Sequence, residues 1–145
     1  MQTDRIVDKA GRVFSVEFVD LGDGGFRLRV LGSRPVAFAN CLPGQGSALR
    51  LMDIRVEDGA DPGKFTWRNL LRPTASLPLR HSGIGHQLLT LVCDCARRRG
   101  YRKVCGDIVP RDLKENPRLP DWYRRQGFSV ERGGQFGEWT IVRDV

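Results

Sequence analysis

The spacing of the hydrophobic residues changes once along the chain, close to residue 84. Before that point, segments such as FRLRVL, residues 26–31, alternate apolar and basic residues, as a strand with one buried face does. From there on the apolar residues recur at helical spacing: Ile84, Leu88, Leu91, Val92, Cys95 and Ala96. Gly100 follows Arg97–Arg99 and ends this helix. The pattern therefore predicts that the strands before residue 84 are followed along the chain by a long helix.

The remaining segments extend this pattern to a full order of elements. GDGG, residues 22–25, supplies turn residues between two strands, and LPDWYRRQGF has proline in its first turn and Gly127 at its end, as a short helix does. The predicted strands are residues 12–21, 26–31, 35–41, 48–57, 101–109, 128–131 and 136–145. The order is four strands, a helix, a strand, a helix and two strands, which indicates an α+β or mixed α/β sheet of about seven strands.

Length and composition bound the class of protein. The 145 residues are expected to form a single domain, and 40% hydrophobic and 28% charged residues are ordinary for a globular protein. No apolar run has the length of a membrane span, and the N-terminus lacks the apolar core of a secretory signal. Four cysteines, Cys41, Cys93, Cys95 and Cys105, form no C-x-x-C pair, so we expect reduced thiols, no metal site and a cytoplasmic protein.

The net charge of +7 has two interpretations. One is a solvated basic surface. The other is a polyanionic partner, which could be nucleic acid, an acidic protein or a phosphorylated cofactor. Basic residues gather at Arg97–Arg99, Arg102 and Lys103, directly after the glycine-rich segment, which favours a partner that carries phosphate.

Two glycines open the long helix, in RHSGIG, residues 80–85. A helix N-terminus offers unpaired N–H groups and the positive end of a dipole, and glycine lets an anion approach them closely. The segment does not match a dinucleotide fingerprint, because position 88 is Leu, and Gly63-Lys64 is not a P-loop, because Phe65 follows it. The two open interpretations are a phosphate site and a helix start whose glycines serve packing.

RHSGIG resembles the [Q/R]-x-x-G-x-[G/A] signature of the GNAT N-acetyltransferases. ENPRLPDWYRRQGF resembles a second motif of that family, N-x6-Y-x3-G-F, with Asn116, Tyr123, Gly127 and Phe128 at its defined positions. The resemblance covers residues 48–130. It implies a mixed, mostly antiparallel central sheet with helices on both faces, in which the strands at 52–56 and 104–109 splay apart to hold acetyl-CoA.

The resemblance also implies a role for individual residues. Tyr123 would be the general acid toward the departing thiolate, and Asp53 or Glu57 would be the base, unless a chain of waters serves instead. Asn116 would hydrogen-bond the pantetheine arm. The implied cofactor-binding residues are Ile54, Arg55, Val56, Arg80, His81, Ser82, Gly83, Ile84, Gly85, His86, Asn116 and Tyr123.

The chain departs from the family pattern in two places. Family members usually carry two helices between their first two strands, whereas residues 21–26 leave room only for a turn. Conversely, a loop at 59–79 is inserted before the glycine-rich segment. Its aromatic and apolar residues Phe65, Trp67 and Leu70 would either form part of a lid over the acceptor or pack against one another.

The resemblance predicts an N-acetyltransferase that moves the acetyl group of acetyl-CoA directly to a primary amine of a small molecule or protein. One alternative is a GNAT-like module that binds CoA without turnover, which would fit the missing helices. Another is a basic nucleic-acid-binding domain, which is less favoured because no such module is recognisable. We expect no membrane partner. Dimers are common in the family, so a homodimer is one possible state of this chain.

Overall fold

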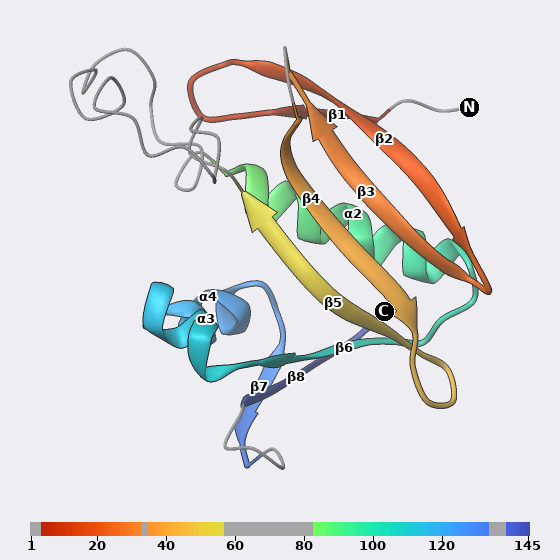
Figure 1. The fold of residues 1–145 in the computed structure, drawn as a ribbon, viewed down its shortest axis with the longest axis vertical. Coiled ribbons are helices and arrows are strands. Elements are labelled where there is room, and N and C mark those ends of the chain that lie inside the picture. Colours follow the sequence, from red (N-terminus) through yellow and green to blue (C-terminus); the bar gives the residue numbers. More distant parts are fainter. Residues whose placement is uncertain (1–3, 33–34, 57–82, 134–138) are drawn as a thin grey trace.

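The computed structural model describes residues 4–32, 35–56, 83–133 and 139–145. They form one eight-stranded sheet in the order β1-β2-β3-β4-β5-β6-β8-β7 (Figure 1). The strands are β1 (Asp4–Val7), β2 (Val13–Gly22), β3 (Gly25–Leu31), β4 (Pro35–Pro43), β5 (Ala48–Val56), β6 (Lys103–Ile108), β7 (Ser129–Arg132) and β8 (Trp139–Asp144). The helices are α2 (Ile84–Arg98), α3 (Pro110–Glu115) and α4 (Leu119–Arg125).

Strands β1 to β5 form an antiparallel meander joined by turns. Alternation places Phe26, Leu28 and Val30 of β3 on one buried face, while Arg27 and Arg29 lie on the other. The turn from β2 to β3 needs left-handed backbone, with φ of 79° at Gly22 and 86° at Gly24. No helix is inserted along this part of the described chain, as residues 21–26 predicted.

Helix α2 covers the buried face of the meander and packs on β1, β3, β4, β5 and β6. Its apolar stripe is fully enclosed, with Ile84, Leu88, Leu89, Val92 and Ala96 all at 0% exposure. Burying a Val, Leu or Ile side chain stabilises the fold by about 1.5–3 kcal/mol, so this face carries much of the free energy of folding. The helix ends as predicted at Gly100, where φ is 86°.

The C-terminal part adds β6 parallel to β5, then β8 antiparallel to β6, then β7 at the edge. We expected helices on both faces of the sheet, but α2 and α4 share one face. Arg143 of β8 shows this, because its Nη1 lies 3.0 Å from the carbonyl oxygen of Gln126, after α4, and 3.9 Å from Cys93 Sγ in α2. The face of β2–β5 opposite α2 carries no described helix.

The fold class and the order of the main elements are confirmed. Two elements were not predicted, the four-residue strand β1 and the helix α3, so the sheet has eight strands instead of seven. The inserted loop at 59–79 lies outside the described residues. No helix in the described ranges is both long and apolar enough to cross a membrane.

Candidate active site

Strands β5 and β6 form a fork, since they pair over four residues and then diverge (Figure 1). The parallel pairing runs from Ala48 opposite Lys103 to Leu51 opposite Gly106. Beyond it, β5 pairs only with β4 and β6 only with β8 in the part of the chain that the structure describes. The last pair is very close, because a Cβ at Gly106 would stand 2.9 Å from the Leu51 carbonyl oxygen. The predicted splay of residues 52–56 from 104–109 is therefore present.

A β-bulge lies on the β5 side of the fork, one residue beyond this last pair. Asn40 pairs with Asp53 and Cys41 pairs with Leu51, so Met52 is the extra residue. Its side chain is 52% exposed. A bulge leaves the extra residue outside the regular ladder and re-aims the strand next to it. We therefore expect backbone polar groups next to the branching point of the fork to be available to a ligand.

The predicted β5 residues divide between the two faces of the sheet. Ile54 and Val56 pack on the core beneath α2, while Asp53 and Arg55 lie on the opposite face. Asp53 Oδ2 lies 3.5 Å from Arg55 Nε, and both side chains are 42% exposed. Ile54 and Val56 could therefore contact a ligand in the fork mainly through their backbone.

The start of α2 lies beside the end of β5 and has the features of an anion site. Gly83 is the N-cap residue, in left-handed backbone with φ 89° and ψ 0°, and no side chain caps the helix. The first turn contains no acidic residue. Unpaired N–H groups and the positive end of the dipole at this terminus therefore keep their capacity to bind an anion.

The second glycine, Gly85, serves packing. A Cβ there would stand 3.4 Å from the Trp122 ring and 3.6 Å from Val56 Cγ2, so the missing side chain makes room for α4 and the end of β5. Gly83 differs, since only the Lys9 and Gln87 side chains come within 4 Å of a Cβ there. The packing interpretation therefore fits Gly85, and the phosphate interpretation stays a prediction for Gly83.

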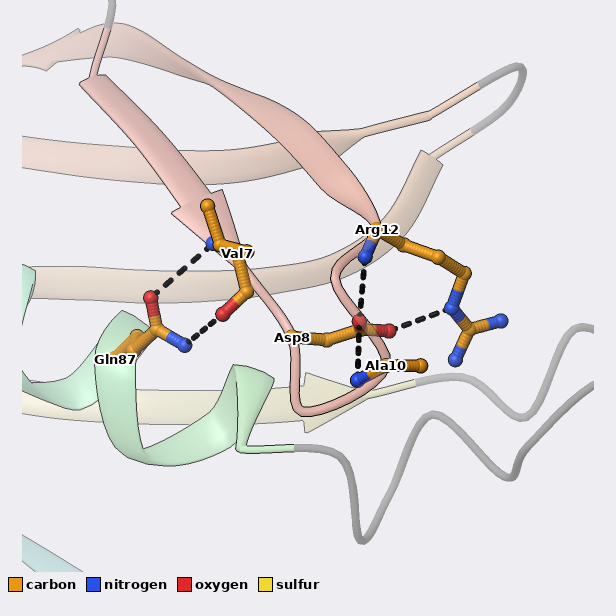
Figure 2. Close-up of polar contacts among 5 residues, drawn as sticks. All are labelled: Val7, Asp8, Ala10, Arg12 and Gln87. Atoms are coloured by element: carbon orange, nitrogen blue, oxygen red, sulfur yellow. Dashed lines mark hydrogen bonds and ion pairs between the residues drawn. The ribbon is translucent and has the colours of Figure 1, made fainter.

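The β1–β2 turn braces the start of α2, a contact that the sequence did not reveal (Figure 2). The side-chain amide of Gln87 donates to the Val7 carbonyl oxygen at 2.6 Å and accepts from the Val7 N–H at 3.3 Å. These two bonds attach α2 to β1 much as a neighbouring strand would. They also hold Lys9, two residues further on, with its Cγ and Cε 3.7 Å from the Cβ position of Gly83.

Asp8 fixes the shape of this turn. Its buried carboxylate accepts N–H groups of Ala10 at 2.9 Å and Arg12 at 2.8 Å, and it receives Arg12 Nε at 2.6 Å (Figure 2). Burial alone would raise the pKa of Asp8, but the hydrogen bonds and charge of Arg12 and the Ala10 N–H outweigh it and lower the pKa. The turn that carries Lys9 is thus held by an ionised carboxylate.

Tyr123 lies in α4 at 5% exposure, with its ring 4.9 Å from that of Trp122 and 5.5 Å from that of Phe128. No group in the described ranges hydrogen-bonds to its hydroxyl. Burial raises the pKa of this phenol well above its usual value, and the charges of Asp112 and Asp53 add to the effect. The phenol is therefore a weaker acid than an unperturbed tyrosine, whose pKa is about 10.

Two other predicted cofactor residues have partners within the protein. His86 Nδ1 contacts Gln126 Oε1, which joins the first turn of α2 to the end of α4. Asn116 ends α3, and its Oδ1 accepts the N–H of Arg118 at 3.2 Å, so it also shapes the link between α3 and α4. Ile84 is fully buried beneath the glycines. Glu57, Arg80, His81 and Ser82 lie outside the described residues.

The thiols are not poised for nucleophilic attack. All four cysteines are free, and burial raises the pKa of each of them, that of Cys41 to about 12. A thiolate is the reactive form, so the raised pKa values disfavour reaction of these groups at neutral pH. In the described part of the chain, no three His, Cys, Asp or Glu side chains are grouped as metal ligands.

Comparison with known proteins gives a match at the level of structure alone. No family model and no curated protein matches the sequence. The GNAT domain of PAT from S. lividans superposes with a TM-score of 0.70 at 12% identity, over 99% of this chain and 97% of that one.

Two similar structures contain coenzyme A. PaiA N-acetyltransferase from Thermoplasma acidophilum, in complex with coenzyme A, matches with a TM-score of 0.56 at 13% identity, over 82% of this chain and 60% of that one. A Bacillus subtilis acetyltransferase in complex with CoA matches with a TM-score of 0.57 at 13% identity, over 86% and 79%. The chain therefore has the fold of the GNAT acetyltransferases, as its two sequence motifs predicted.

Proposed function

We propose that this chain is an acetyl-CoA-dependent N-acetyltransferase that acts on a primary amine by direct transfer. The observation that carries the proposal is the fork between β5 and β6, with the uncapped start of α2 beside the end of β5. The charge of Asp53 of β5 contributes, after burial and Asp112, to the raised pKa of the Tyr123 phenol in α4. The CoA complexes of proteins with this fold support the choice of cofactor.

The residues present fit such a cofactor. Gly83 offers backbone free of a Cβ at the helix start, and Lys9 adds a positive charge beside it, which together suit a pyrophosphate. The diverging edge of β5 at residues 52–55 would hold the pantetheine arm by backbone hydrogen bonds. Arg80, His81, Ser82 and Asn116 remain predicted contacts.

In the reaction, the amine nitrogen bonds to the acetyl carbon, the carbon–sulfur bond breaks, and CoA leaves as a thiolate. Backbone N–H groups beside the Met52 bulge would stabilise the oxyanion that forms on the way. The Tyr123 hydroxyl would donate a hydrogen bond to the departing sulfur. Asp53, or water held near it, would accept the proton that the amine loses; Glu57 is the other candidate for this base.

A ligand titration tests the proposal. Acetyl-CoA at a hundredfold excess over its Kd should stabilise the fold by about 2.7 kcal/mol, read as a rise in Tm, and NAD should not. Release of free thiol in the presence of a panel of amines then separates an enzyme from a module that only binds CoA. Nucleic acid that raises Tm in a salt-sensitive way, without any effect of acetyl-CoA, would instead favour a nucleic-acid-binding domain.

A further inference from the structure

The face of the sheet opposite α2 carries an ordered set of charges across β2 to β5. Strand register places Glu17, Arg29, Phe38 and Arg55 in one row across the four strands. The next row contains Val19, Arg27, Asn40 and Asp53. Two cations, Arg27 and Arg29, therefore occupy β3, in the middle of this face, and β5 carries Asp53 together with its ion-pair partner Arg55, beside the fork.

These rows line an open surface hollow of about 190 Å³, bordered by Arg27, Arg29, Phe38, Asn40 and Asp53 among others. Arg27 Nε donates to Asn40 Oδ1 at 2.5 Å, so this guanidinium leans from β3 toward β4 and over the hollow. Arg29 has one acidic neighbour, Glu17 Oε1 at 3.4 Å, and both side chains are more than a third exposed. Exposed ion pairs of this kind are weak, so an anionic ligand can compete for Arg29.

We propose that the acceptor is an amine that also carries a carboxylate, and that Arg27 and Arg29 bind this carboxylate. This inference rests on the proposed function. The guanidinium group is planar and offers paired N–H donors that match a carboxylate, and two such groups lie on this face of β3, two residues apart. The amine would then extend over Phe38 and Asn40 toward Asp53 and the bulge at Met52.

Strand spacing sets the size of such an acceptor. Neighbouring strands lie about 4.8 Å apart, so β3 and β5 are separated by about 10 Å. Arg27 leans across part of this distance, which leaves about 5–10 Å between the carboxylate and the amine nitrogen. A flexible aliphatic chain of several methylenes spans this range, whereas an α-amino acid that reacts at its α-amine does not.

A series of ω-amino acids tests the inference. Acetylation of glycine, β-alanine, 4-aminobutyrate, 5-aminovalerate and 6-aminohexanoate would be compared with that of n-alkylamines of equal chain length, by free-thiol release. We expect kcat/KM to exceed that of the matched alkylamine by about 10- to 100-fold for the longer members, the value of a charge-assisted contact. Glycine should show no such preference.

Two variants locate the effect. Arg27→Gln and Arg29→Gln should each lower kcat/KM for the longer ω-amino acids and leave the alkylamines unchanged. Arg97→Gln, which removes an exposed, ion-paired arginine at the far end of α2, should alter neither class of amine. An unchanged acetyl-CoA Kd would show that each variant is folded, and the comparison of amines on the unaltered chain needs no variant.

The outcomes separate this inference from the proposed function. If acetyl-CoA neither binds nor releases thiol with any amine, the proposed function is refuted and this inference with it. If acetyl-CoA binds but no ω-amino acid is acetylated, or each is used no better than its alkylamine, only the inference is overturned. A preference for carboxylate that survives both arginine substitutions would also overturn it.

Discussion

Replacing Tyr123 with phenylalanine should lower kcat by about 10- to 100-fold and leave the acetyl-CoA Kd within about twofold. The magnitude follows from the environment of the phenol. A general acid is typically worth about 10²–10⁴-fold, but burial raises the pKa of Tyr123 far above that of a thiol, about 8.5. Full proton transfer to the thiolate is then uphill. The hydroxyl contributes one hydrogen bond to a developing charge, which is worth about 1.5–3 kcal/mol.

The substitution isolates this role because the ring contacts do not use the hydroxyl. Trp122 and Phe128 pack on the ring, and the hydroxyl has no hydrogen-bond partner in the described ranges, so Tm should hardly change. The chain has one other tyrosine, Tyr101, whose hydroxyl donates to the Gly24 carbonyl oxygen at 3.4 Å. Tyr101→Phe is therefore a matched control and should leave kcat unchanged.

The pH dependence gives a second readout of the same role. A raised pKa keeps the phenol protonated up to at least pH ~10, so the loss caused by Tyr123→Phe should be equal at neutral and mildly alkaline pH. Steady-state rates would be measured where chemistry limits turnover, as shown by the lack of a product burst. A kcat within about twofold of the unaltered chain would refute the role in catalysis, and a matching loss of acetyl-CoA affinity would make Tyr123 a binding residue.

Three further substitutions probe the start of α2. Lys9→Ala should raise the acetyl-CoA Kd by about 3- to 10-fold at low salt and by less at high salt, in calorimetric titrations; Lys114→Ala is the control, and equal effects would contradict the contact. Gly85→Val should overpack the site against Trp122, which costs about 1–3 kcal/mol of stability and lowers Tm, whereas Gly85→Ala should be tolerated. A Val variant that keeps its Tm but no longer binds acetyl-CoA would favour the phosphate interpretation instead. Asp8→Asn should lower Tm near neutral pH, because the ionised carboxylate of Asp8 supplies the stability. The difference in Tm between the two proteins should shrink as the pH falls from about 4 through the lowered pKa of Asp8. A difference in Tm that does not vary with pH would count against this role.

The main elements could be predicted because their apolar residues repeat with the spacing of a helix or of a strand over many residues. Helix α2 has an apolar stripe from Ile84 to Ala96, and β3 alternates between buried and more exposed residues from Phe26 to Leu31. The segments that were not predicted lack such a pattern. Strand β1 is only four residues long with a single buried side chain, Ile6, and α3 buries none of its side chains. Their conformations depend on pairing with β2 and on the position of Pro110 at the helix start.

The site could be predicted in its motifs but not in its contacts. Tyr123 and Gly83 follow from short patterns, whereas the bracing of α2 by the β1–β2 turn joins residues 80 positions apart. Nothing local in the sequence indicates that Gln87 bonds to Val7. The packing role of Gly85 depends likewise on Trp122, which reaches it only once α4 has docked beside α2.

The absence of a side chain at Gly106 sets the position where β5 and β6 part. Position 106 can approach the Leu51 carbonyl oxygen only because glycine has no Cβ, which would otherwise stand at 2.9 Å from that oxygen. Any other residue would force this last pair open and move the branching point back toward Cys105 and Arg50. The slot would then be one residue longer, and the Met52 bulge would stand one residue further from the point where the strands part. A substitution at this one glycine would therefore change how deep an acyl chain extends into the slot, without altering a residue that contacts the ligand.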